Sequence, residues 1–231
     1  MVLSQAERQA VEDAVRAGEQ STRGEIYCVI AGESSEYRET PLAWAAAAAL
    51  AAPAVLLAAG VQVSVPEVFG TSWSAAQIGA AAEAAARAAL LGALLLQGVL
   101  FVLVALVVSI PQVRRALTPR GLKRERVRMR AREQFMAKNL QATRERTGVL
   151  IYVSVKERMA ELLADEGIAA KVDAKAWDPA MAALVEGLRR GAAGEGFTTA
   201  IGLCADILAA HFPAGGADNP NELSDKLVVL P

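Results

Sequence analysis

Two long apolar stretches dominate the pattern of hydrophobic and polar positions. Residues 42–63 read LAWAAAAALAAPAVLLAAGVQV and residues 88–110 read AALLGALLLQGVLFVLVALVVSI, and neither stretch holds a formal charge. A bilayer core about 30 Å thick needs about 20 apolar residues in a helix, so both are long enough to span it. The pattern therefore predicts a transmembrane hairpin within residues 41–111.

The first stretch has a second interpretation. It is mostly alanine with Pro53 inside it, whereas the second stretch is rich in Leu, Val and Phe. An alanine-rich helix of this length could instead lie buried in the core of a soluble protein. However, small side chains let two helices approach closely in lipid. We therefore expect the first span to pack against the second.

Shorter patterns precede the hairpin, in residues 1–40. Ser4-Gln5-Ala6-Glu7 has the spacing of a capping box, which predicts the start of a helix. Residues 25–31 form a continuous apolar run rich in β-branched and aromatic side chains, which is typical of a buried strand. This segment is the first part of an interrupted α/β domain.

The same order repeats after the hairpin. Residues 121–146 predict a long helix, and residues 149–155 predict the clearest strand of the chain. Helix before strand, twice, indicates an α/β layer with a small buried sheet flanked by helices. If the two strands pair in parallel, everything between them is one crossover connection.

The rest of the second part, within residues 112–213, is mostly helical. Residues 156–167 fit either a helix or a turn followed by a strand from 159 to 164. Asp178-Pro179 predicts the start of a helix that ends near Gly191, and a last helix is expected over about 196–212. We expect residues 214–231 to form a loose tail.

Basic residues concentrate directly after the second apolar stretch. Residues 114–135 hold nine of the 24 Lys and Arg residues. Lys and Arg are enriched in short cytoplasmic segments beside membrane spans, and they attract anionic lipid headgroups. This places both termini in the cytoplasm and residues 64–87 in an extracytoplasmic loop. The predicted membrane-anchoring and lipid-contacting residues are Arg114, Arg115, Arg120, Lys123 and Arg124.

The overall charge does not favour a nucleic-acid-binding protein. The 231 residues are 54% hydrophobic and the formal net charge is −1. The basic stretch has no recognised binding motif and no aromatic platform beyond Phe135. We therefore predict no nucleic-acid partner.

Motifs for catalysis are sparse. Cys28 and Cys204 each lie in an apolar run and are interpreted as core residues. The only histidine, His211, lies near the end of the last predicted helix, where the helix dipole favours a cation. Ser154 ends a strand, but the sequence identifies no base for it. No catalytic residue and no cofactor is predicted from these features.

Three carboxylates are the best candidates for a metal site. Glu25 starts the first strand, and Asp165 and Glu166 lie in a predicted turn, where their oxygens could gather around Ca²⁺ or Mg²⁺. Two alternatives remain. The turn residues could simply be solvated, and Glu25 could form an ion pair with Arg146.

The order of these segments resembles the TPM domain family. The resemblance is carried by LSQAERQAVEDAVRAGEQSTRGEIYCVI in front of the hairpin, and by RTGVLIYVSVKERMAELLADEGI with the two closing helices behind it. The chain is similar to the bacterial membrane branch, in which a span pair interrupts the domain after its first strand. The resemblance implies an α/β sandwich, a strand at 159–164 and a location in the bacterial inner membrane.

The resemblance also bears on activity, because some plant members are described as acid phosphatases and acidic loop residues with divalent metal are implicated. This chain departs from the family pattern. It has Arg146-Thr147-Gly148 where Asp-Asn-Gly is usual, and Asp165-Glu166-Gly167 where Gly-Tyr-Gly is usual. We therefore predict a membrane-anchored, non-catalytic module that binds or assembles other membrane or cytoplasmic proteins. The alternative is a phosphatase.

Overall fold

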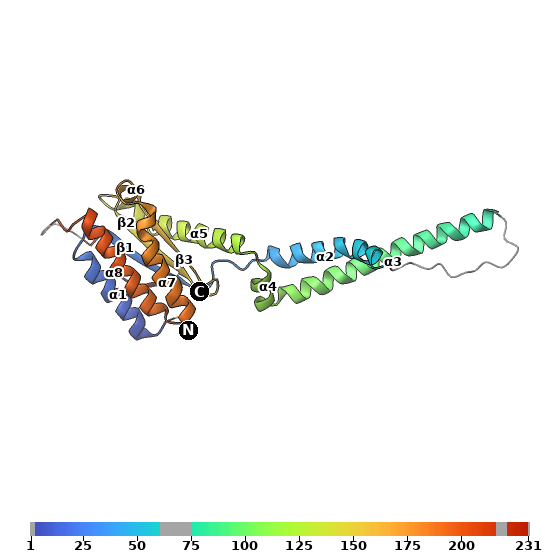
Figure 1. The fold of residues 1–231 in the computed structure, drawn as a ribbon, viewed down its shortest axis with the longest axis horizontal. Helices are drawn as coiled ribbons and strands as arrows, with labels where there is room; N and C mark the ends of the chain where they lie inside the picture. Colours follow the sequence, from blue (N-terminus) through green and yellow to red (C-terminus); the bar gives the residue numbers. More distant parts are fainter. Residues whose placement is uncertain (1–2, 61–74, 216–220, 231) are drawn as a thin grey trace. The chain divides into compact units, whose positions relative to one another are not determined.

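The computed structural model describes residues 3–60, 75–215 and 221–230. The chain divides into two compact units. One contains Met1–Glu36 with Pro119–Pro231, and the other contains Tyr37–Thr118. Figure 1 shows the elements of both units. The first unit holds the strands and the helices around them, and the second holds the apolar helices.

A four-stranded sheet forms the centre of the α/β domain, with the order β3-β2-β1-β4. Strands β1 (Glu25–Ala31) and β2 (Gly148–Ser154) pair in parallel along their whole length. Strand β3 (Met159–Ala164) pairs antiparallel to β2 through a tight turn. The hairpin alternative for residues 156–164 is therefore confirmed, and the insertion lies within the crossover from β1 to β2.

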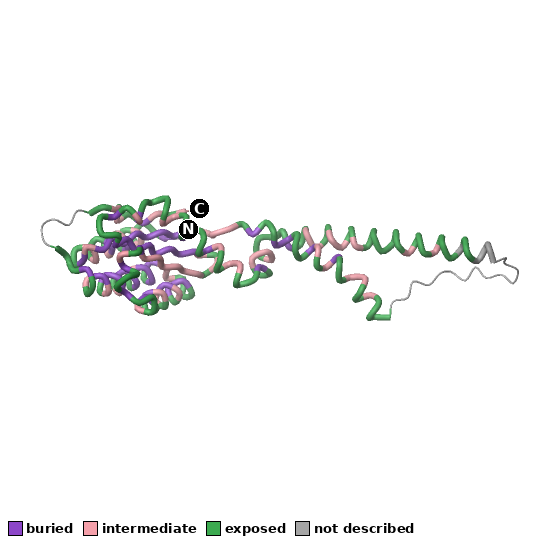
Figure 2. The backbone as a smooth tube through the Cα atoms, turned by 90° about the horizontal axis from the view of Figure 1, so that it is seen from above, coloured by how far each residue is buried: buried purple, intermediate pink, exposed green. Residues whose placement is uncertain are grey.

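The two central strands are buried at every position, as the purple segments of Figure 2 show. Helices therefore cover both faces of the sheet. On one face lie α1 (Gln5–Glu19), α7 (Asp178–Arg190) and α8 (Ala193–His211). On the other lies α5 (Arg120–Ala137), through Val127 and Ala131. The architecture is a mixed α/β layer with a small sheet between helices.

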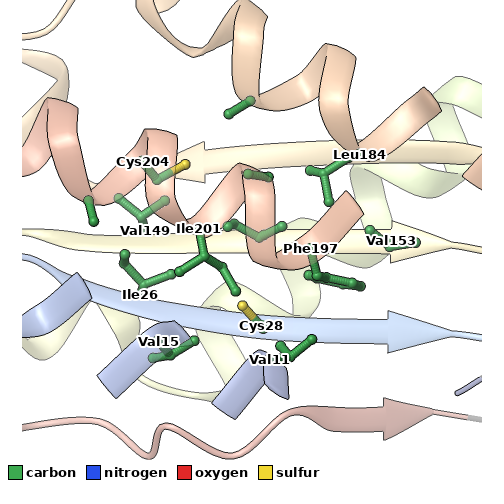
Figure 3. Packing of buried hydrophobic residues seen from close by; sticks show 14 of the residues in the cluster. Val11, Val15, Ile26, Cys28, Val149, Val153, Leu184, Phe197, Ile201 and Cys204 are labelled. Carbon is green, nitrogen blue, oxygen red and sulfur yellow. The ribbon is translucent and has the colours of Figure 1, made fainter. Parts of the chain in front are cut away.

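The larger core lies beneath α1 and α8. Figure 3 shows Val11 and Val15 of α1, and Phe197 and Ile201 of α8, packed around the strands. Cys28 and Cys204 are both buried in this core and form no disulfide. The interpretation of the two cysteines as core residues is confirmed.

Helix α1 begins as the sequence predicts. The Ser4 hydroxyl accepts a hydrogen bond from the Glu7 backbone N–H, and the Glu7 carboxylate accepts one from the Ser4 backbone N–H. This capping box satisfies backbone donors that the first turn of a helix leaves open. The exposed carboxyl of Glu7 has a lowered pKa because the Ser4 backbone N–H binds its charged form.

Helices α7 and α8 cross at a pair of glycines. A Cβ atom added at Gly187 would lie 2.7 Å from the Gly196 Cα atom, and one added at Gly196 would lie 3.2 Å from the Ala183 carbonyl oxygen. The two backbones therefore touch without intervening side chains. Helix α7 ends at Arg190, close to the predicted end, and its C-cap residue Gly191 has a φ of 74° in the left-handed region.

The C-terminal segment is more ordered than expected. Residues 214–231 are predicted to be loose, but Val228–Leu230 form β4, which pairs in parallel with β1. Glu12 of α1 accepts a hydrogen bond from the Leu227 backbone N–H at 3.3 Å, and Arg16 contacts Asp225 at 3.3 Å. Residues 216–220 and 231 of the predicted tail lie outside the described residues.

The helix predicted over residues 121–146 is shorter in the structure. Helix α5 ends at Ala137, and Asn139 takes a left-handed conformation with a φ of 55° before the short 3-10 helix η1 (Leu140–Ala142). The apolar pattern continues past the break because Leu140 packs into the core beside α5. Two further short elements precede α7, namely α6 (Glu166–Ala169) and the 3-10 helix η2 (Ala174–Trp177).

The second unit contains α2 (Glu39–Ala58), α3 (Ala75–Ser109) and α4 (Pro111–Leu117). Two helical segments, Glu39–Ala58 and Ala82–Ser109, are long and apolar enough to cross a membrane. Only 17% of the first apolar window and 6% of the second are buried, which contradicts the alternative of a buried core helix for the first stretch. Helix α2 packs on α3, as expected.

Two boundaries of the predicted hairpin change. Residues 64–87 are expected to form a loop, but α3 starts at Ala75, so the second half of this segment is helical. Residues 61–63 of the first predicted span and 64–74 of the predicted loop lie outside the described residues. Within the unit, the Trp44 indole donates a hydrogen bond to the Leu117 carbonyl oxygen at 3.2 Å.

Candidate functional site

Two of the three predicted metal ligands contact an arginine. The Arg146 guanidinium lies 3.5 Å from an Asp165 carboxylate oxygen and 3.1 Å from a Glu166 carboxylate oxygen. Asp165 also caps α6 by accepting a hydrogen bond from the Glu166 backbone N–H at 2.7 Å. Each of these two carboxylates thus has the Arg146 guanidinium as a partner.

Glu25 is bound by the C-terminal segment. Its carboxylate accepts hydrogen bonds from the backbone N–H groups of Glu222, at 3.3 Å, and of Leu223, at 3.1 Å. Burial raises the pKa of Glu25 above its usual value, and the two backbone donors oppose this shift. The alternative ion pair with Arg146 does not form, because Arg146 contacts Asp165 and Glu166 instead.

The metal-site hypothesis gains no support from this geometry. Among the residues that the structure describes, no group of three or more His, Cys, Asp or Glu side chains could hold a metal ion. Glu25, Asp165 and Glu166 each have a protein partner instead. A site for Ca²⁺ or Mg²⁺ stays a prediction.

The predicted lipid-contacting residues separate into two groups. Arg114 and Arg115 belong to α4 of the apolar unit, whereas Arg120, Lys123 and Arg124 belong to the first two turns of α5 in the α/β domain. The second group lines a cavity of about 550 Å³ within the α/β domain. This volume falls in the range of about 300–1,000 Å³ that is usual for ligand pockets.

The cavity lies around the start of β3. Its other walls come from the turn between β2 and β3, from β3 itself and from α7. Besides the three basic residues of α5, it is lined by Val127, Glu157, Arg158, Met159, Ala160, Glu161, Val185 and Arg189. Five basic and two acidic side chains therefore share one concave surface.

Both acidic side chains of the cavity have protein partners. Glu161 contacts Arg128 at 3.4 Å, and burial raises the pKa of Glu161 while Arg128, Arg132 and Arg124 oppose that shift. Glu157 accepts a hydrogen bond from the Ser34 backbone N–H at 3.3 Å. By contrast, none of the five basic side chains forms an ion pair with another described residue.

A chain of hydroxyl groups ends at Glu157. Ser34 donates to the Ser154 hydroxyl at 2.9 Å, and Ser154 donates to the Glu157 carboxylate. The Tyr152 hydroxyl lies 3.0 Å from that of Ser34. Because Ser34 donates to Ser154, Tyr152 is the donor to Ser34. Burial raises the pKa of Tyr152, so its hydroxyl keeps the proton that this direction requires.

The hydroxyl chain lies at the carboxyl ends of β1 and β2. In α/β sheets, ligands bind preferentially beyond the carboxyl ends of the parallel strands. Backbone hydrogen bonds fix the same region, because Val155 donates to Ala31 and Lys156 donates to Gly32, both at 3.0 Å. The turn before β3 is thus held against the segment that follows β1.

Sequence reasoning missed Glu157, Arg158 and Arg189. The sequence identifies no base for Ser154, but in the structure the chain turns between β2 and β3, and the Glu157 carboxylate, three positions later, accepts a hydrogen bond from the Ser154 hydroxyl. That spacing is the only sequence signal for this contact. Nothing in the sequence links Arg189 of α7 to the basic stretch of α5, since their proximity depends on the packing of β3. His211 lies at the end of the last helix, as predicted, and it is exposed.

Comparisons with known proteins show similarity at the level of the fold. No protein-family model matches the chain, and no curated protein is significantly similar to it. The NMR structure of the BA42 protein from the psychrophilic bacterium Bizionia argentinensis superposes with a TM-score of 0.55 at 18% sequence identity. The match covers 99% of this chain and 96% of the BA42 chain.

Proposed function

We propose that the chain is a membrane-anchored member of the TPM domain family that acts as a non-catalytic interaction or assembly module at the cytoplasmic face of the bacterial inner membrane. The observation that carries this proposal is the pair of exposed apolar helices inserted between two hydrogen-bonded strands. Burial of so much apolar surface in lipid stabilises both helices. The TPM-like sandwich is supported by the strand and helix order of the α/β domain.

The strand pairing also supports a hairpin that enters and leaves the membrane on one side. Strands β1 and β2 pair in parallel over seven positions of one sheet, so the two ends of the insertion must lie on the same side of any membrane that it crosses. The basic residues after α3 favour the cytoplasmic side. Both termini are then cytoplasmic.

The surface proposed for protein binding is the outer edge of β3. This strand ends the sheet, and all six of its residues are partly exposed. Edge strands present backbone N–H and C=O groups that can pair with an extended segment of another protein. We propose that membrane or cytoplasmic protein partners add a strand along this edge.

Photocrosslinking tests the interaction surface in the intact protein. A diazirine-bearing aliphatic amino acid at Leu162 of β3 is expected to give discrete protein adducts in native membranes. The same group at the exposed Ala210 of α8 serves as the control. Equal labelling from both positions, or no protein adduct at Leu162, would contradict a β3 docking edge. Resistance of the protein to alkaline carbonate extraction tests membrane anchoring separately.

A second candidate function, phosphate ester hydrolysis, is favoured by one observation. The Ser154 hydroxyl donates to the Glu157 carboxylate beside a basic cavity, as a nucleophile and its base would. Ser154 is fully buried, however, so a substrate could reach it only if the turn moved.

We expect the detergent-purified protein to show no turnover of a generic phosphate ester, with Ca²⁺ or Mg²⁺ or with a chelator. The variants Ser154→Ala and Asp165→Ala distinguish two possible sites if turnover is found. Loss in Ser154→Ala alone would establish a hydrolase at the hydroxyl chain. Metal-dependent turnover lost only in Asp165→Ala would place it at the predicted metal site instead.

A further inference from the structure

We propose that the basic cavity at the start of β3 binds the headgroup of an anionic phospholipid, namely a phosphate that carries a hydroxylated alcohol. The inference rests on the proposed membrane anchoring and adds a specific ligand to it. A binding site built by the fold differs from the general attraction of basic residues to lipid, because it uses residues that are distant in the sequence.

The net positive charge of the cavity favours an anion. Arg120, Lys123 and Arg124 come from α5, while Arg158 and Arg189 come from the β2–β3 turn and from α7. Like charges gathered in one concavity repel each other, and the five cations outnumber Glu157 and Glu161, the two acidic residues of the lining. A phosphate group supplies oxygen acceptors and a charge that matches several guanidinium groups at once.

The start of α5 adds to this preference. The helix has 18 residues, and neither a capping side chain nor an acidic residue is found in its first turn. Acidic residues are favoured at the positive end of a helix dipole, yet this end carries Arg120 and, one turn on, Lys123. The open backbone N–H groups and these side chains together favour an anionic ligand.

The two carboxylates argue for a ligand that also has hydroxyl groups. Glu157 and Glu161 line the same cavity and would repel a bare polyanion. Each can accept a hydrogen bond from an alcohol. A glycerol headgroup joined through one phosphate satisfies the cations and the carboxylates together, whereas inorganic phosphate satisfies only the cations.

The position in the chain favours a lipid over a soluble phosphate ester. Only α4 and a short connection separate Ser109, the last residue of the apolar helix α3, from Arg120 of the cavity. If α3 crosses the membrane, Arg120 lies close to the lipid headgroups, whose local concentration is high. A soluble ligand gains no such advantage.

Titration of the full-length protein tests the proposal. The protein is delipidated in a neutral detergent, and short-chain phosphatidylglycerol is added while bound lipid is counted by native mass spectrometry. We expect saturable binding of one lipid that is at least tenfold tighter than binding of the matching phosphatidylcholine. Phosphatidic acid, which lacks the glycerol headgroup, is expected to bind more weakly than phosphatidylglycerol.

Variants connect the binding to the cavity. The double variant Arg158→Gln/Arg189→Gln is expected to lower the affinity at least tenfold, because it replaces two guanidinium groups that would donate hydrogen bonds to the lipid phosphate. Both residues lie outside the juxtamembrane stretch. Lys175→Gln, at an exposed cation of η2 outside the cavity, is the matched control and should leave binding unchanged. Thermal unfolding of each variant confirms that the domain is folded.

The other outcomes overturn the proposal. Equal binding by the double variant and the control would show that the cavity is not the site. Equal binding of phosphatidylcholine would remove the requirement for an anion. If soluble glycerol phosphate binds as tightly as the lipid, the ligand is a soluble ester. Carbonate extraction distinguishes these failures from failure of the membrane anchor itself.

Discussion

Replacing Gly187 by alanine is expected to lower the free energy of unfolding by about 2–3 kcal/mol, the usual cost of overpacking. The added Cβ atom would lie 2.7 Å from the Gly196 Cα atom and 2.9 Å from the Ala192 carbonyl oxygen. Both contacts are with backbone, so no side-chain rotation relieves them. Helix α8 would have to move away from α7, which opens the core that it covers.

Gly202→Ala is the matched control for Gly187→Ala. Gly202 is solvent-exposed and lies in the middle of α8, and a Cβ atom added there meets nothing within 4 Å. Alanine is favoured over glycine inside a helix by about 1 kcal/mol, so this variant should be slightly more stable than the parent protein. Pulse proteolysis of the full chain in urea measures both changes. Similar shifts in the two variants would contradict a close helix crossing at Gly187.

The second large effect is expected from Glu19→Gln, and it depends on pH. Burial raises the pKa of Glu19 to about 8, and the nearby carboxylates of Glu25 and Asp225 add to the shift. The Ile26 backbone N–H, which donates to Glu19 at 2.8 Å, opposes it. The carboxyl of Glu19, at the end of α1, is therefore mostly protonated in the folded protein at neutral pH.

The sign of the pH effect follows from the two states. The unfolded chain loses this proton near the ordinary pKa of 4.5, while the folded protein keeps it until about pH 8. The contribution to stability is thus complete below pH 4.5 and is lost as the pH rises to about 8. Glutamine is neutral and retains a carbonyl acceptor for Ile26. Glu19→Gln should therefore raise stability at pH 8.5 by on the order of 3 kcal/mol.

Urea unfolding of both proteins at pH 5 and pH 8.5 tests this expectation. The difference between Glu19→Gln and the parent should be small at pH 5 and large at pH 8.5. The measurement at pH 5 is the internal control, since the parent carboxyl is then protonated in the folded state. An equal difference at both pH values would show that the substitution acts through packing rather than through ionisation.

The sequence predicts the elements whose signal is local. The capping box at Ser4 joins groups three residues apart, and the apolar runs of β1 and β2 and the Asp178-Pro179 pair are each visible in a few consecutive residues, although β1 and β2 pair with each other across the whole insertion. The start of α3 at Ala75 was missed because its first turns are alanine-rich and weakly apolar. Strand β4 was missed because three residues form it and their partner, β1, is distant in the sequence.

The candidate site was predictable only in part. The basic residues of α5 follow from composition alone, and their interpretation as lipid contacts rests on the adjacent apolar stretch. The contributions of Arg158 and Arg189 depend on how the β2–β3 turn and α7 pack, which no local pattern encodes. The Arg146 contacts with Asp165 and Glu166 likewise bring together a residue before β2 and two residues after β3.

The parallel pairing of β1 with β2 also determines when the domain can fold. A ribosome releases β1 and must then make residues 32–147, including both apolar helices, before the neighbouring strand exists. During that interval, α1 and β1 have no sheet partner, and their apolar side chains are exposed to other chains. If α2 and α3 cross the membrane as proposed, both are made before the sheet can be completed, so their insertion can begin first. If membrane insertion is blocked, we expect proteases to cleave the N-terminal residues, because α1 and β1 then stay unfolded.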